Sequence, residues 1–171
     1  LKEVRRSSEA ALKYVIYGAV ASGIMIYGMS LIYGLTGSTN LMEIRSALST
    51  TPPSAEFAQF VAVLFVLAGF GYKIAAVPFH MWTPDVYEGA PTPITAFLSV
   101  GPKAAGFAVL IRFFYMAYAG AGQEQGLWAP LSDIGWPMLL GALSAGTMTV
   151  GNLMAINQNN VKRLLAYSSI A

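Results

Sequence analysis

The chain alternates between long apolar runs and short polar connections. Apolar runs occupy about residues 10–35, 55–77, 94–119 and 134–157, and a further run begins at about residue 161 and continues to residue 171. A helix needs roughly 20 mostly apolar residues to cross a bilayer, and the first four runs reach that length. Strands of a membrane barrel are only about 10 residues long and alternate strictly. The pattern therefore predicts an all-α integral membrane protein, a multi-span helix bundle that forms a single domain.

Two prolines interrupt this helical pattern. Pro78 follows Lys73 at the end of the second run, and Pro102 stands inside the third run, directly before Lys103. Proline lacks an N–H group and clashes with the preceding turn, so it ends or kinks a helix. Backbone groups freed at membrane depth are tolerated where they are buried in protein or line a watery cavity. The sequence thus predicts a discontinuous second helix, an interrupted third helix, and space for water beside each lysine.

The composition supports a membrane protein and excludes several other classes. The 171 residues are 56% hydrophobic and 11% charged, whereas ordinary globular domains are about 25% charged. The net charge of +2 gives no reason to expect a nucleic-acid partner. The chain has no cysteine and one histidine, His80, which argues against disulfides, thiolate metal sites and iron–sulfur clusters.

Basic residues indicate the orientation of the spans. They flank the start of the first span and follow the fourth, at Lys2, Arg5, Arg6, Lys13, Lys162 and Arg163. The loops expected on the opposite side offer one basic residue near the membrane, Arg45. The prolines of residues 78–93 indicate a loop between the second and third spans. Because cytoplasmic loops carry an excess of Lys and Arg, we expect the N-terminal end, this loop and the turn at residues 159–163 to face the cytoplasm.

Lys103 and Lys73 are the main candidates for chemistry. Lys103 lies near the middle of the third span. Inserting a lysine there costs about 2.5–3.5 kcal/mol, and a charged residue at this depth usually has a function. The alternative is a structural lysine whose long side chain extends its charged end to the membrane interface, but this is unfavourable from the middle of a span. Lys73 is nearer a helix end, so that alternative is stronger there, but the neighbouring helix break favours an ion-translocating role.

Lysine suits a proton relay because burial can move its pKa from about 10.4 to about 5–6. Arginine stays charged, so Arg112 is interpreted as an anchor at the outer end of the third span. Lys13 either reaches the interface or forms the cytoplasmic end of the relay, and both interpretations stay open.

Three further polar residues near residue 80 admit two interpretations each. His80 can pass protons or simply pack beside a tryptophan. Asp85 and Glu88 can collect protons or pair with Lys162 and Arg163.

Three long motifs resemble one known family. "GYKIAAVPFHMWTPDVYEGAPTP", "GPKAAG" and "QNNVKRLLAYSSIA", in this order and spacing, are similar to the antiporter-like membrane subunits of respiratory complex I, the proton-pumping NADH:quinone oxidoreductase. "PDVYEGAPTP", together with lysine in "GPKAAG", resembles the subunit N (chain 2) group of that family. The resemblance covers essentially the whole chain.

The resemblance implies a proton-translocating module built from two inverted five-helix repeats, of which this chain is a piece. By motif match, Lys73 is the lysine of the broken seventh helix, Lys103 that of the eighth and Lys13 that at the head of the sixth. The glutamate partner of the family lies outside this stretch, and Glu56 does not match it. Quinone and NADH are used by the whole complex, and this chain is expected to hold no cofactor and no redox centre. Its expected partners are other membrane-arm subunits, protons and the lipids of the cell inner membrane.

Two other functions stay open. A subunit of a multi-subunit cation/proton antiporter or of a membrane-bound hydrogenase would share the lysines and the broken helix. A structural membrane scaffold without transport would tolerate glutamine or methionine at both Lys73 and Lys103, which a relay would not.

Overall fold

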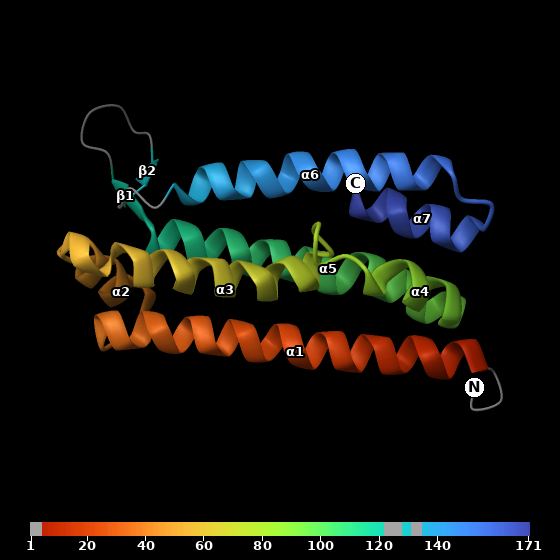
Figure 1. Ribbon diagram of the computed structural model, residues 1–171, viewed down its shortest axis with the longest axis horizontal. Helices are drawn as coiled ribbons and strands as arrows, with labels where there is room; N and C mark the ends of the chain where they lie inside the picture. The colour runs from red at the N-terminus through yellow and green to blue at the C-terminus, as the bar shows by residue number, and fades with distance from the viewer. Residues whose placement is uncertain (1–4, 122–127, 131–134) are drawn as a thin grey trace.

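The computed structural model describes residues 5–121, 128–130 and 135–171. Four long helices run side by side along the molecule (Figure 1): α1 (Arg5–Thr36), α3 (Glu56–Ile74), α5 (Thr92–Ala117) and α6 (Trp136–Ile156). All four are long and apolar enough to cross a membrane. The predicted class, an all-α multi-span bundle, is confirmed.

Shorter elements connect and flank these helices. They are α2 (Leu41–Leu48), a single 3₁₀ turn (Pro53–Ala55), α4 (Trp82–Gly89), α7 (Val161–Ile170), and the two strands β1 (Ala119–Ala121) and β2 (Trp128–Pro130). The strands pair antiparallel as a small ribbon beyond α5, which the apolar pattern did not predict. Helix α7 turns back beside α6 after a short connection (Figure 1).

The helix boundaries differ from the predicted spans mainly at two places. Helix α1 begins at Arg5, before the predicted start at about residue 10, because basic residues are compatible with a helix that projects past the apolar layer. Helix α3 ends at Ile74, before the predicted end at about residue 77. Residue 134, the predicted start of the fourth span, and Lys2 lie outside the described residues.

The end of α3 explains why the helix stops ahead of Pro78. Ala75 adopts a left-handed conformation with a φ of 60°. Its N–H donates to the Tyr72 carbonyl at 3.2 Å, and the N–H of Ala76 donates to the Gly71 carbonyl at 2.8 Å. This pair of hydrogen bonds is the Schellman motif, which terminates a helix and satisfies its last carbonyls. The predicted discontinuity is confirmed, and the two carbonyls freed at the helix end accept hydrogen bonds from the backbone N–H groups of Ala75 and Ala76.

The segment after the break is helical, although it was predicted to be a loop. The prolines of "HMWTPDVYEGAPTP" indicated a loop, but Pro84 lies in the first turn of α4 and Pro93 in the first turn of α5. The first helical turn tolerates proline because its N–H groups have no intrahelical partner. The predicted interruption at Pro102 is also wrong, since α5 continues through it as one helix.

Close packing of α1 against α3 holds one side of the bundle together. Gly28 of α1 allows this approach, because a Cβ there would lie 2.9 Å from the Ala62 carbonyl oxygen and 2.8 Å from the Phe65 Cβ. At the start of α4, the Trp82 ring lies tilted against the Tyr72 ring, with 5.1 Å between the ring centroids, and its Nε1–H donates to the Tyr72 carbonyl at 3.1 Å. The core therefore fixes α4 against the end of α3.

Candidate functional site

Lys103 is a buried amine in the interior of the bundle. Its side chain projects from α5 toward α7, and the residue is 7% exposed. The ammonium group donates one hydrogen bond to the Ser169 hydroxyl at 2.8 Å and another to the Ser169 carbonyl oxygen. A lysine has three N–H donors, so two of them have partners among the described residues. The predicted intramembrane position of Lys103 is thus accompanied by a specific binding partner on another helix.

Lys73 lies on a neighbouring turn but points elsewhere. It occupies the last turn of α3, where a positive charge favours the helix C-terminus, and its side chain is exposed. A Cβ placed on Gly106, one turn after Lys103, would lie 3.5 Å from the Lys73 Cβ. The structure therefore brings the backbones that carry Lys73 and Lys103 together. Within the described part of the chain, Lys73 makes no hydrogen bond or ion pair, and the hydrogen bonds of Lys103 go to Ser169.

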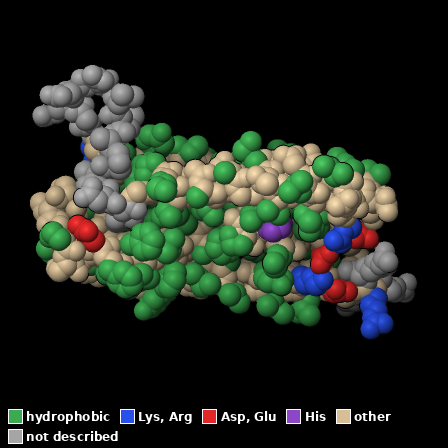
Figure 2. All heavy atoms as spheres, turned by 45° about the horizontal axis from the view of Figure 1, so that its top comes forward, with side chains coloured by type: hydrophobic (Ala, Val, Ile, Leu, Met, Phe, Trp, Pro, Cys, Tyr) green, Lys and Arg blue, Asp and Glu red, His purple; other side chains and the backbone are tan. Residues whose placement is uncertain are grey.

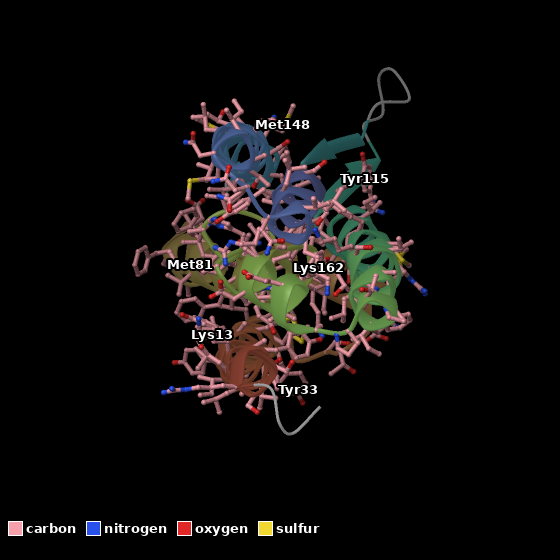
Figure 3. The ribbon with its side chains drawn as sticks, turned by 90° about the vertical axis from the view of Figure 1, so that its right-hand side faces the viewer. Lys13, Tyr33, Met81, Tyr115, Met148 and Lys162 are labelled. Carbon is pink, nitrogen blue, oxygen red and sulfur yellow. The ribbon has the colours of Figure 1, made fainter. Side chains whose placement is uncertain are left out.

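Lys13 belongs to a charge cluster at one end of the bundle. Its Nζ lies 2.6 Å from an Asp85 carboxylate oxygen on α4 and 2.8 Å from Glu9. Arg163 of α7 binds the other Asp85 oxygen at 2.8 Å and Glu88 at 3.1 Å. Basic and acidic side chains gather at this end (Figure 2). Viewed from the same end, α4 lies between α1, which carries Lys13, and α7, which carries Lys162 (Figure 3).

The cluster confirms part of the pairing that the sequence suggested. Arg163 pairs with both acids of α4, whereas Lys162 donates to the Ala90 carbonyl at 2.9 Å and pairs with no acid among the described residues. Burial raises the pKa of Asp85, but hydrogen bonds from Lys13 and Arg163 outweigh burial, so its pKa lies below the ordinary value. Asp85 is thus held ionised, which makes it a poor proton acceptor near neutral pH.

Water has access to this cluster through a small pocket. The pocket has a volume of about 220 Å³, and Glu9, Lys13, Asp85 and Glu88 line it. The polar pocket therefore lies at the charged end, on the Lys13 side of the bundle.

His80 lies between the break and α4. Burial lowers its pKa, and its Nδ1 is buried without a hydrogen-bond partner among the described residues.

A second cavity adjoins the break itself. It has a volume of about 450 Å³ and lies among α3, α5, α6 and α7. Its walls are mostly apolar, with polar contributions from Ser144, Thr147 and Ser169. Thr147 of α6 also accepts a hydrogen bond from the Val77 N–H at 3.0 Å, which ties the broken segment to α6. The space predicted beside the break exists, but it is less polar than predicted.

Sequence reasoning missed the residues that partner the candidate lysine and the break. Ser169 and Thr147 lie 66 and 70 positions from the groups that they bind. The signal available was a hydroxyl inside an apolar run, which is common in membrane helices because these side chains bond across helices or back to their own turn. Such hydroxyls are too frequent in this chain for the sequence alone to select these two.

The fold and the site together define an integral membrane helix bundle with a discontinuous helix and a hydrogen-bonded intramembrane lysine. A family model described as "NADH:quinone oxidoreductase/Mrp antiporter, TM" matches residues 1–171. The chain belongs to this family, as its motifs indicated.

Individual relatives agree with this assignment. The chain is 62% identical over 169 residues to "NADH-quinone oxidoreductase subunit N 2" of Sorangium cellulosum, covering 97% of this chain and 32% of that protein. Among solved structures, respiratory complex I from Thermus thermophilus matches with a TM-score of 0.73 and 41% identity, over 95% of this chain and 31% of that one. The Mrp complex from Dietzia sp. matches with a TM-score of 0.77 over 95% of this chain and 27% of that one, but at 24% identity it shows the fold alone. The chain spans about a third of the length of the relatives it matches.

Proposed function

We propose that this chain is part of a proton-translocating, antiporter-like membrane subunit of NADH:quinone oxidoreductase, in which Lys73, Lys103 and Lys13 form a proton relay. The observation that carries the proposal is Lys103, an amine buried within a membrane span and bound to a neighbouring helix. The relatives named NADH-quinone oxidoreductase subunit N supply the biological context. The redox reaction belongs to the whole complex, which uses NADH and quinone, whereas this chain contributes proton transfer.

The chemistry of Lys103 suits gain and loss of a proton. Burial penalises the charged amine, and an isolated lysine at the centre of a span costs about 2.5–3.5 kcal/mol. The two Ser169 acceptors favour the charged amine. Because these effects oppose each other, a change in a nearby charge can decide whether Lys103 is protonated. A lysine that served only packing would not need such a balance.

Lys73 and Lys13 fit neighbouring positions of the same relay. Lys73 is exposed within a span, so in the full subunit its amine must face protein or water, and a carboxylate on a covering helix would stabilise its charge. Lys73 adjoins the turn after Lys103 through Gly106. Lys13 lies at the polar pocket, where it pairs with two carboxylates. We infer that Lys13 serves the entrance and that Lys73 exchanges protons with Lys103.

The same proposal includes the orientation and the partners. The charged end with Lys13 and Arg163 faces the cytoplasm of a cell whose inner membrane holds the protein, as the excess of basic residues in cytoplasmic loops suggests. Other membrane-arm subunits and lipids cover the many exposed apolar side chains of the spans. The 62% identity to a subunit N relative favours this assignment over a cation/proton antiporter, for which the similarity to the Mrp complex supports only the fold.

Glutamine substitutions test whether the lysines are needed. In the full complex, reconstituted in sealed vesicles, we expect Lys103→Gln and Lys73→Gln to lower proton pumping about tenfold or more, since a positioned proton-transfer group is typically worth about 10²–10⁴-fold. Arg112→Gln is the matched control, because Arg112 is an exposed cation of the same helix as Lys103. Pumping at the unaltered level in both lysine variants would support the scaffold function instead.

A further inference from the structure

Ser169 contacts Lys103 through two oxygens that behave differently. The carbonyl oxygen can only accept a hydrogen bond, so it favours an amine that carries all its protons. The hydroxyl both accepts from Lys103 at 2.8 Å and donates to the Ala166 carbonyl at 3.0 Å. That carbonyl lies within the same helix and already accepts the helical bond expected from Ile170. The hydroxyl can therefore turn away from Ala166 at little cost.

Tyr87 brings a second hydroxyl to this part of the bundle, since it packs in one buried cluster with Ala166 and Ile170, which lie on either side of Ser169 in α7. The residue lies on α4, is 1% exposed, and its hydroxyl is buried without a hydrogen bond of normal geometry among the described residues. Burial raises the pKa of the Tyr87 phenol, and the nearby Ser169 side chain acts in the opposite direction. Leaving a buried hydroxyl unpaired costs free energy. Because the Tyr87 hydroxyl lies near the Ser169 side chain, a hydrogen bond between the two in another state of the site would recover that cost.

The charge cluster holds α4 and α7 in this register. Arg163 binds Asp85 at 2.8 Å and Glu88 at 3.1 Å, and Lys162 binds the carbonyl oxygen of Ala90 at 2.9 Å. Ser169 lies less than two turns after Arg163 on α7, and Tyr87 lies between the two acids on α4. The ion pairs therefore set the position of the Ser169 hydroxyl relative to Tyr87.

We propose that Ser169 and Tyr87 are positioning residues for proton transfer at Lys103. The inference rests on the proposed function of Lys103 and adds two groups that respond to its charge. In the charged state, Lys103 donates to the Ser169 hydroxyl and carbonyl, the two contacts that the structure contains. In the neutral state, Ser169 donates its O–H to the lone pair of the amine, and Tyr87 donates its O–H to the Ser169 oxygen.

Protons balance in this exchange. One N–H bond of the Lys103 ammonium breaks, and the proton passes to the next base of the relay, a water molecule or a neutral amine. Ser169 and Tyr87 keep their own protons and only change their hydrogen-bond acceptors. Each protonation state of Lys103 thereby keeps hydrogen bonds to Ser169, which lowers the cost of moving between the two states.

The test is the rate of proton pumping by the full complex in sealed vesicles, with the amount of assembled complex measured for each variant. We expect Ser169→Ala and Tyr87→Phe each to lower the rate about three- to tenfold, the effect of losing a hydrogen bond in one protonation state only. Ser169→Thr, which restores a hydroxyl, should recover most of the rate. Tyr118→Phe is the matched control. Tyr118 directly follows the C-terminal end of α5, is 0% exposed, and its hydroxyl also lacks a partner among the described residues.

The outcomes separate the two levels of the account. A merely structural Tyr87 hydroxyl without a bond could be removed without loss, so an unchanged rate in Tyr87→Phe overturns the inference. A loss in Ser169→Ala that threonine does not recover, or an equal loss in Tyr118→Phe, also overturns it. Lys103→Gln is measured in parallel. If that variant alone fails, the proposed function stands without the inference, and if it pumps normally, the proposed function itself fails.

Discussion

Lys103 and Asp85 illustrate how the surroundings of one residue decide its role. Lys103 is the one buried charged residue in the described part of the chain, and its partners are a hydroxyl and a carbonyl without charge. Nothing among these partners locks the amine in its charged form. Asp85 instead contacts two cations, and its side chain is 32% exposed. These surroundings support the proposed proton exchange at Lys103 and favour a structural role for Asp85.

Asp85→Asn should loosen α4 without abolishing proton transfer. Because the ion pairs are partly exposed, we expect a local loss of about 1 kcal/mol or less, seen as faster hydrogen–deuterium exchange of the α4 amides in the intact complex. The lowered pKa of Asp85 means that its contribution is present above the ordinary carboxyl pKa and is lost as the pH falls through the value in the folded protein. The difference in local stability of α4 between the variant and the unaltered complex, measured by this exchange, should thus be constant from pH 8 to about pH 5. A difference that disappears within that range would contradict this assignment.

The broken helix shows how one element positions several others. Helix α3 stops at Ile74 with a Schellman motif, and Trp82 then anchors the start of α4 on the Tyr72 carbonyl. This geometry places Tyr87 toward α7 and Asp85 toward α1 and α7. Without the break, one continuous helix could not contact both partners. The discontinuity is therefore what allows α4 to link the first and last described helices.

Gly28→Ala should weaken the contact between α1 and α3. A methyl group at this position would lie 2.9 Å from the Ala62 carbonyl oxygen, so the helices must separate. We expect a destabilisation of about 1–3 kcal/mol, as for other overpacked sites, measured as a lower thermal stability and yield of the detergent-solubilised complex. Gly23→Ala is the control on the same helix, because no atom lies within 4 Å of its added methyl group. Equal effects of the two variants would show that helix propensity, not the contact, matters.

The sequence predicted the spans, the break near Pro78 and the buried position of Lys103, because each depends on local composition and on the chemistry of proline. It did not predict α4, since the prolines that suggested a loop occupy tolerant first-turn positions. It also did not predict the Lys103–Ser169 contact, which joins residues 66 positions apart. Contacts of this kind depend on how the helices pack, and an apolar run with scattered hydroxyls does not encode which of them faces a given lysine.

The whole molecule separates charge from apolar surface along its length. Ion pairs tie α1, α4 and α7 at one end, and exposed apolar side chains cover the spans, as on Val15, Val20 and Phe107. Such a surface requires lipid or neighbouring subunits around it. Lys103 is buried within the span α5, one turn before the Gly106 position that adjoins Lys73. The arrangement fits a path that enters at the charged end and continues through the lysines of the bundle.

The most direct test of this account is the number of protons pumped per electron by the full complex carrying Lys103→Arg, reconstituted in sealed vesicles. Arginine keeps the positive charge and a similar length but does not release its proton near neutral pH. The account predicts that pumping through this subunit falls sharply while the complex still assembles. Pumping and quinone reduction at the rates of the unaltered complex would show that Lys103 acts as a fixed charge and that protons take another path.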